Sequence, residues 1–304
     1  MTGIDSKKPD EYNLGRNYAD ASRLNLQHFM WRDAIKFLLH PIIQIHLRHE
    51  QESKQNRDEG VLQVADLATG TGIWLFDLVK SAEVNGLNIQ FHGLDISRAL
   101  FPHNAWLPKN ISLSTSNLLE EPPESLHGKF DVVHVRLVLS LIGSGSPKPI
   151  MRHIKMLLKP GGYLQWDELD PNNHYEVLTP KPDEKAPNMT STFERVGTIA
   201  DWSWIAKLPE TLREEGFEEA SQSPHESNPE MFKAWTYMDL CLAEELSYHL
   251  QRMYDDGEHG EKWRGFLPKA YDEADEAHGA VLRVRPTVTI ARKPLCSSSR
   301  ESRL

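Results

Sequence analysis

The chain has 304 residues, of which 39% are hydrophobic and 26% charged, as in a globular protein with one large domain. Its formal net charge of −10 argues against a nucleic-acid backbone as the main partner, because phosphate binding needs a basic face. The two cysteines form no metal-ligand pattern, and no apolar run approaches the ~20 residues that span a bilayer. We therefore expect a cytoplasmic monomer or homodimer that holds no metal and binds neither nucleic acid nor membrane.

The first part of the chain is predicted to form a helical cap at 11–56, after a polar N-terminus (1–10) that we expect to be disordered. Apolar side chains recur at roughly helical spacing from Asn17 to Leu47. Pro41 interrupts this pattern, so it ends one helix or starts the next. The highly polar stretch 46–60 predicts a helix end followed by a loop.

Short apolar runs alternate with helical segments from residue 61 to residue 170. Such runs, bounded by Gly- and Pro-containing turns, are typical of buried strands. Strands that alternate with helices imply right-handed crossovers and a parallel, doubly wound α/β sheet. Strands are expected at 61–67, 88–94, 111–115, 130–135 and 163–166, with helices at 73–82 and 149–158.

The remainder of the chain is less regular. A segment rich in Pro, Asn, Lys and Asp at 174–189 predicts a loop, and the Ser- and Arg-rich tail 294–304 predicts disorder. A short strand and the final strand would form an antiparallel pair at one sheet edge, with helices inserted between them. Helices are expected at 191–215, 231–253 and 261–277, and strands at 218–223 and 281–291.

The loop 66–72, with the sequence DLATGTG, follows the first predicted strand. Ligands of open α/β sheets bind at the carboxyl ends of the strands, so this loop is the first candidate binding site. Gly70 and Gly72 lack Cβ, which allows a tight turn and close backbone approach to a ligand. A dinucleotide pyrophosphate and the methionine end of S-adenosylmethionine (SAM) both suit this geometry.

The spacing and charge of the loop favour SAM. A dinucleotide loop has the spacing GxGxxG, whereas Ala68, Gly70 and Gly72 follow a GxGxG-type spacing. Asp66 ends the first strand, where a carboxylate would repel a pyrophosphate but helps to hold a cationic amino acid. Asp95 ends the second strand, and a carboxylate there binds ribose hydroxyls in either kind of site.

Three motifs in this order resemble class I SAM-dependent methyltransferases: VADLATGTG at 64–72, GLD at 93–95 and KPGG at 159–162. The segments ASRLNLQH at 21–28 and LHP at 39–41 further resemble fungal methyltransferases of secondary metabolism. The core resemblance covers about 61–170 and departs at Ala68, where the family usually has Gly. It implies a Rossmann-like methyltransferase fold with a seven-stranded sheet at 57–293, plus a substrate lid. The lid would consist of the N-terminal helices and helical insertions at about 170–210 and 229–280, the second before the last strand.

The resemblance also implies roles for individual residues. Asp95 would bind the ribose, and Asn117 would accept a hydrogen bond from the adenine amino group through its amide oxygen. Ile96 and Leu118 would sandwich the adenine ring. Val135 and Arg136 would lie near the sulfonium and the acceptor. The methionine moiety would be lined by Asp66, Ala68, Thr69, Gly70 and Gly72.

Three residues are candidates for the chemistry of transfer, each beside a structural alternative. His28 lies on a predicted N-terminal helix and is either a base in the closed pocket or a surface or core histidine. Arg136 either holds a carboxylate of the cofactor or an acceptor group, or forms an ion pair with Asp167 or Glu168. Glu168 either orients the acceptor and takes its proton or belongs to a solvated loop.

The predicted function is transfer of a methyl group from SAM to a small-molecule acceptor, as O- or N-methylation of a fungal natural-product intermediate. Because the methyl carbon is already activated, the protein mainly supplies positioning and a dry pocket. Two alternatives stay open. One is a regulatory methyltransferase-like protein in a nuclear complex, and the other is a SAM-binding enzyme that catalyses a cyclisation or dehydration without methyl transfer.

Overall fold

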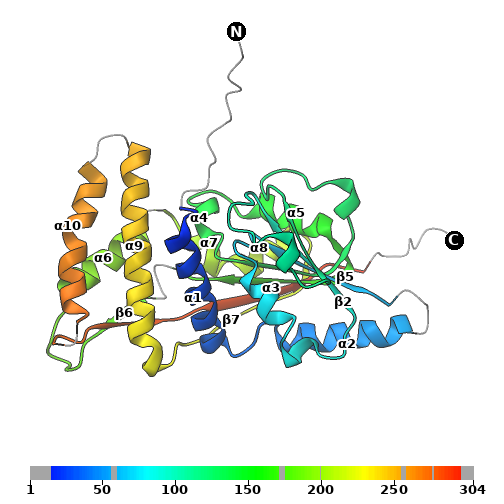
Figure 1. Cartoon of the computed structure of the whole chain (residues 1–304), viewed down its shortest axis with the longest axis horizontal. Coiled ribbons are helices and arrows are strands. Elements are labelled where there is room, and N and C mark those ends of the chain that lie inside the picture. The colour runs from blue at the N-terminus through cyan, green and yellow to red at the C-terminus, as the bar shows by residue number, and fades with distance from the viewer. Residues whose placement is uncertain are drawn as a thin grey trace, which may run out of the picture.

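The computed structural model describes residues 15–55, 60–170, 175–198, 200–254, 258–275 and 277–295. The disorder expected at 1–10, and at 296–304 within the tail, concerns residues outside these ranges. The described chain forms a seven-stranded sheet in the order β3-β2-β1-β4-β5-β9-β7, flanked by helices on both faces (Figure 1). The prediction of a doubly wound α/β fold is confirmed.

The first five strands run parallel, and β9 runs antiparallel to both β5 and β7. The antiparallel pair expected at one edge is therefore present as β7 and β9. A separate two-stranded sheet, β6 with β8, lies outside the main sheet. The strands are β1 Leu62–Leu67, β2 Ile89–Asp95, β3 Ile111–Thr115, β4 Phe130–Arg136, β5 Leu158–Glu168, β6 Tyr175–Leu178, β7 Glu218–Pro224, β8 Val281–Val284 and β9 Thr287–Arg292.

The helices agree with the sequence-based expectation in place more closely than in length. Short 3-10 turns lie at Ala82–Val84, Asn104–Trp106, Glu124–Leu126 and Pro229–Met231. The α-helices are α1 Tyr18–Ile35, α2 Pro41–Gln55, α3 Ile73–Leu78, α4 Leu139–Ile142, α5 Lys148–Leu157, α6 Pro187–Thr198, α7 Ser203–Ala206, α8 Leu208–Glu214, α9 Phe232–Tyr254 and α10 Glu258–Glu273.

One predicted helix assignment was wrong, and one helix end lies late in the stretch where it was expected. The polar stretch 46–60 is helical as far as Gln55, because Ile43 and Leu47 are fully buried and hold α2 against the sheet. The single helix expected at 191–215 is divided into α6, α7 and α8. Pro209 lies in the first turn of α8, where proline starts a helix but does not continue one.

Three predicted strand assignments also needed correction. The expected strand 281–291 is two strands in two different sheets, since Pro286 cannot donate to a ladder between them. The loop expected at 174–189 contains β6, which pairs with β8. The KPGG segment lies inside a longer β5, where Gly162 approaches β4 closely: a Cβ there would lie 3.0 Å from the Asp131 carbonyl oxygen.

The core has two parts, one on each face of the main sheet. Alternate residues of β1 and β4 separate them: Val64 and Val132 face α1, α2 and α3, while Ala65 and Val133 face α5, α7 and α8. All four side chains are fully buried. Burial on both faces explains why these strands read as continuous apolar runs in the sequence.

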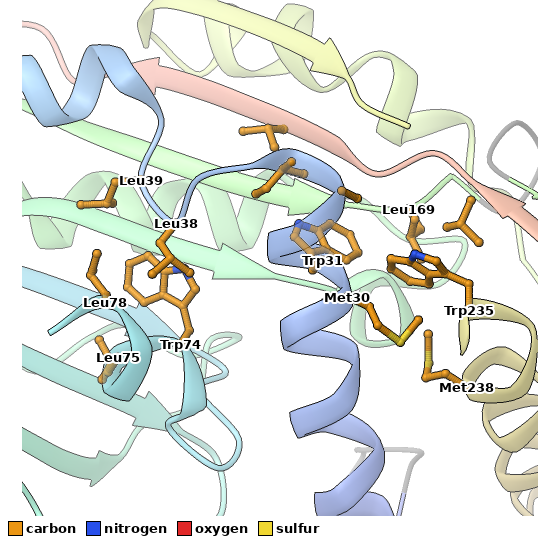
Figure 2. Close-up of a cluster of buried hydrophobic side chains, with 14 of the residues drawn as sticks. Met30, Trp31, Leu38, Leu39, Trp74, Leu75, Leu78, Leu169, Trp235 and Met238 are labelled. Carbon is orange, nitrogen blue, oxygen red and sulfur yellow. The ribbon is translucent and has the colours of Figure 1, made fainter. Parts of the chain in front are cut away.

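Helix α1 connects the sheet to the helical insertion. In Figure 1 it lies between α3 and the group formed by α6, α9 and α10. Figure 2 shows Met30 and Trp31 of α1 beside Trp235 and Met238 of α9. The ring centroids of Trp31 and Trp235 are 6.4 Å apart. The insertion thus shares one apolar core with the N-terminal helices.

Candidate cofactor and acceptor site

A cavity of about 590 Å³ lies along the carboxyl edge of the sheet, at the ends of β3, β2, β1 and β4. Leu24 and Gln27 of α1 contribute to its wall. Most of the residues predicted to bind a cofactor line this cavity. They are Asp66, Ala68, Thr69, Gly70, Asp95, Ile96, Asn117, Leu118 and Arg136.

The loop after β1 has an unusual backbone conformation. Ala68, Gly70 and Gly72 have φ angles of 52°, 55° and 79°, all in the left-handed region. This region favours glycine, so the GxGxG-type spacing follows from the conformation that the loop needs. Gly72 is the N-cap of α3 and does not contribute to the cavity wall. A Cβ on Gly70 would lie 3.6 Å from Leu24 of α1, so the helix closes over the loop.

Asp95 stands at the centre of the cavity edge and is held by two backbone bonds. Its Oδ2 accepts from the Gly70 N–H at 2.8 Å, and its Oδ1 accepts from the Ser97 N–H at 3.0 Å. Burial raises the pKa of this carboxyl, although these two bonds act in the opposite direction. Each oxygen keeps a further lone pair for a ligand hydroxyl. The arrangement suits a vicinal diol such as a ribose.

The far end of the cavity has two apolar side chains and an amide. Ile96 is 41% exposed and Leu118 is 6% exposed. The Oδ1 of Asn117 accepts from the Leu119 N–H at 3.0 Å, and its Nδ2 donates to Glu120. An amide oxygen has two lone pairs, so one remains for a ligand donor.

A buried hydrogen-bonded network lies beneath the β1 and β4 ends. His134 Nδ1 lies 2.7 Å from Asp66 Oδ1, and His134 Nε2 lies 3.3 Å from Asp167 Oδ2. Thr69 donates its hydroxyl to Asp66 at 2.6 Å, and the indole of Trp74 stacks on His134 at 3.9 Å. Burial opposes a charge on His134, but the bonds to the two carboxylates prevail and raise its pKa. His134 therefore bridges the two carboxylates, which favour its protonated form.

The sequence analysis did not identify the position of His134 between the two carboxylates. The strand register carries the missing signal. Asp66 pairs with His134 in the β1–β4 ladder, and Arg136 pairs with Asp167 in the β4–β5 ladder. Single-sequence reasoning does not supply that register.

Arg136 ends β4 and reaches the cavity, while His28 lies behind it. Arg136 Nη2 donates to His28 Nδ1 at 3.3 Å, so His28 carries its proton on Nε2. That Nε2–H donates to Asp77 of α3 at 2.9 Å. Burial, followed by the charge of Arg136, lowers the pKa of His28 to about 4. His28 is therefore neutral, fully buried and hydrogen-bonded through both nitrogens, and it does not line the cavity.

Glu168 and Val135 also lie outside the cavity wall. Glu168 Oε1 accepts from the Val138 N–H at 2.8 Å and from the Trp166 indole at 3.2 Å. Burial raises the pKa of Glu168 to about 8. Its direct structural effect is to fix the backbone of Val138, which lines the cavity. Val135 is fully buried in the core on the α5 face.

Three tryptophans of the second half of the chain belong to the core and do not line the cavity. Trp202 and Trp204 belong to the core on the α5 face and Trp235 to the core on the α1 face. No group of three or more His, Cys, Asp or Glu residues suited to a metal ion occurs within the described ranges. None of the helices in those ranges has the length and hydropathy needed to cross a membrane.

The fold and the cavity define a class of protein: residues 65–164 match the family model described as a methyltransferase domain. Over these residues the chain is similar to methyltransferase domains, and its sheet has the order described above.

The relatives that match are fungal proteins. The chain is 38% identical to the methyltransferase grgD of a Penicillium species over 171 residues, covering 54% of this chain and 55% of grgD. It is 26% identical to the N-methyltransferase tcpN of Claviceps purpurea, covering 66% of this chain and 64% of tcpN. It is 27% identical to the secondary metabolism regulator LAE1 of Hypocrea atroviridis, covering 54% of this chain and 42% of LAE1. The chain thus spans less than two thirds of the length of each of these relatives.

Proposed function

We propose that this protein transfers a methyl group from SAM to a small-molecule acceptor, as O- or N-methylation in fungal secondary metabolism. The observation that carries the proposal is the cavity at the ends of β1 and β2. There, the loop after β1 has residues with left-handed backbone angles and lines the cavity with its backbone. The carboxylate of Asp95 is already held in place by the Gly70 N–H. The names of grgD and tcpN support a methyltransferase, and that of tcpN supports an amine acceptor.

The residues present fit the cofactor. Asp95 would hold the ribose hydroxyls, and Ile96 with Leu118 would flank the adenine beside Asn117. The loop from Ala68 to Gly72, together with Asp66, would hold the methionine moiety. When bound, SAM supplies a methyl group on a positively charged sulfur. A cavity lined by Asp66 and Asp95 is suited electrostatically to a positive charge.

The chain's own contribution to transfer is positioning and exclusion of water. We propose that α1 and the insertion that includes α9 form the lid, since Leu24 of α1 already lies against Gly70. We assign supporting roles to the predicted catalytic residues: His28 positions Arg136, and Glu168 fixes Val138. An amine acceptor needs no protein base, because it loses its proton to water.

The deciding experiment is calorimetric titration of the protein with SAM and with S-adenosylhomocysteine. We expect saturable binding by the wild type and a loss of at least ~100-fold in affinity for Asp95→Ala, because both ribose bonds disappear. Asp201→Ala, at an exposed aspartate, is the matched control and should bind normally. The absence of saturable binding by the wild type would refute the proposal. Circular dichroism verifies that each variant is folded.

A regulatory role is the second candidate function, supported by the similarity to LAE1. The two candidates differ in turnover. An enzyme of the proposed kind releases S-adenosylhomocysteine stoichiometrically with a methylated small molecule when incubated with SAM and an extract of the producing cells. A regulator binds SAM without such turnover and co-purifies with a defined protein complex.

A further inference from the structure

Arg136 introduces a positive charge at the β4 end of the cavity. The cavity runs from the β3 end, past Asp95 at β2 and the loop after β1, to Arg136. Under the proposed function, this is the end occupied by the methionine moiety and the acceptor. A guanidinium at such a place is costly to desolvate unless it has a partner.

Within the described part of the chain, no carboxylate lies within 4.0 Å of this guanidinium to form an ion pair. Asp167 and Asp66 attract it electrostatically, but both carboxylates bind His134 instead. The guanidinium donates one of its five N–H groups to the neutral His28. The charge is therefore retained at the cavity without a direct counterion.

Helix α1 holds the guanidinium in place. The Cζ atom of Arg136 lies 5.7 Å from the ring centroid of Trp31, so the indole covers one face of the guanidinium. His28, one turn earlier on the same helix, accepts its hydrogen bond. Asp77 fixes His28 from behind and is itself held by Arg32 at 2.6 and 2.7 Å. Four side chains from α1 and α3 thus fix the orientation of one cationic group.

Several apolar residues line the cavity together with Arg136, as do the polar Gln27, His134 and Ser140. Leu24, Leu137, Val138 and Leu141 line the same cavity. Leu137 has a φ of 56°, a strained conformation for a bulky residue, directly after Arg136. Strain of this kind persists only where the surrounding structure imposes it, and it accompanies ligand sites.

We infer that Arg136 is a recognition site for an anionic oxygen, a carboxylate or a phenolate, on a ligand whose neighbouring part is apolar. A guanidinium binds such oxygens with two parallel N–H bonds, which would supply the missing counterion. The anionic oxygen belongs either to the acceptor or to the methionine carboxylate of the cofactor. The inference rests on the proposed function for the identity of the cofactor, but not for the existence of the anion site.

The test compares Arg136→Met with the wild type, and Arg213→Met serves as the matched control. Arg213 is an exposed arginine, bonded to the Ala220 carbonyl rather than placed at the cavity. The probes are S-adenosylhomocysteine, 5′-methylthioadenosine, which lacks the amino-acid part, and the pair benzoate and benzamide. Calorimetry measures the nucleosides, and ligand-detected NMR measures the aromatic probes with and without S-adenosylhomocysteine.

Two results support the anion site and separate its sources. If the oxygen is that of the cofactor, Arg136→Met loses ~10-fold or more in affinity for S-adenosylhomocysteine and keeps that for methylthioadenosine. If it belongs to the acceptor, both nucleosides bind normally, and benzoate binding is lost in the variant. In the wild type, benzoate then binds more tightly than benzamide.

Other results refute the inference or the proposed function separately. Unchanged nucleoside affinities together with equal benzoate binding in wild type and Arg136→Met overturn the anion site. A wild type that binds no nucleoside overturns the proposed function, while the benzoate titration of the free protein still decides the anion site. If Arg136→Met does not fold, Arg136→Gln and Arg136→Lys replace it, and only the lysine variant should retain benzoate.

Discussion

At the scale of single residues, Ala68 departs from the family's motif at a position where the backbone conformation favours glycine. The family usually has Gly at this position, and the φ of 52° explains why. An L-residue in the left-handed region costs roughly 1–2 kcal/mol, because its Cβ meets the following carbonyl. The loop therefore keeps its shape despite the side chain, which indicates that the surrounding structure imposes it.

Ala68→Gly should raise the free energy of unfolding by about 0.5–1 kcal/mol. The relief of strain exceeds the extra backbone entropy that glycine loses on folding. Urea denaturation measures the change. Ala65→Gly is the control, since Ala65 is a buried residue of β1 outside the left-handed region, and it should be destabilised. Equal destabilisation of both variants would contradict this account of the loop.

The candidate site was predicted only in part from the sequence, for a physical reason. Asp66 and Asp95 were identifiable because each lies at the carboxyl end of a strand, and these ends meet at one sheet edge. The bridge that His134 makes to Asp66 and Asp167 depends on which residues face each other across three strands. That register depends on tertiary packing, which no local pattern encodes.

At the scale of elements, α1 packs against α9 and contributes Leu24 and Gln27 to the cavity wall. Arg23 of α1 and Glu245 of α9 form an ion pair at 2.8 Å, with side chains only 7% and 12% exposed. A pair this well buried leaves an uncompensated charge when one partner is removed.

Arg23→Met should lower the free energy of unfolding by about 3 kcal/mol, and the double variant with Glu245→Leu should lose less than the sum of the single losses. Unfolding in urea gives the coupling energy from the four proteins. The pair Arg152 and Glu215 is the control: Arg152 is 65% exposed, so the coupling there should stay below about 1 kcal/mol. Similar coupling in both pairs would show that α1 docks chiefly through its apolar face.

Most strand boundaries were predicted well, including those of the largely exposed edge strands β3 and β7. The segment 111–115 was predicted without error, and the remaining parallel strands came within one or two residues at most ends. The failure at 281–291 has a single cause. The run is rich in β-branched residues on both sides of the break, so it reads as one strand, although Arg285 and Pro286 separate two sheets.

At the scale of the whole molecule, several buried groups make stability depend on pH. Burial raises the pKa of Glu168 to about 8 and that of Asp239 to about 7. The folded state thus binds these protons more tightly than the unfolded chain does. Their contribution is present below pH of about 4.5 and is lost as the pH rises towards 8. The contribution of His28 to stability has the opposite pH dependence. Because its pKa is lowered to about 4, this contribution is lost as the pH falls towards 4.

Glu168→Gln should remove part of this dependence. Between pH 5 and pH 8 the free energy of unfolding of the variant should rise by about 3 kcal/mol relative to that of the wild type. The reason is that glutamine does not titrate, whereas Glu168 loses its proton over this range. Urea denaturation across this range measures the difference, with the exposed Glu210→Gln as control. Parallel pH profiles for wild type and Glu168→Gln would contradict the raised pKa.

The doubly wound fold was predicted because the alternation of strands and helices is visible in local sequence patterns. The arrangement of the insertion was not predicted. The helices of the insertion were located from apolar spacing, but β6 has only four partly buried residues and no clear pattern. Its partner β8 lies over a hundred residues away. Pairing at that distance leaves no trace in a single sequence.

The division of the last apolar segment between two sheets has a mechanical consequence. β8 belongs to the small sheet of the insertion, and β9 follows after two residues in the main sheet. Thr287, the first residue of β9, pairs with Glu168, whose carboxyl holds the Val138 backbone at the cavity. One short covalent tether therefore connects the insertion to the wall of the cavity beside the β4 end. Substitutions far out in the insertion should thus be sensed at the cavity without any contact to a ligand.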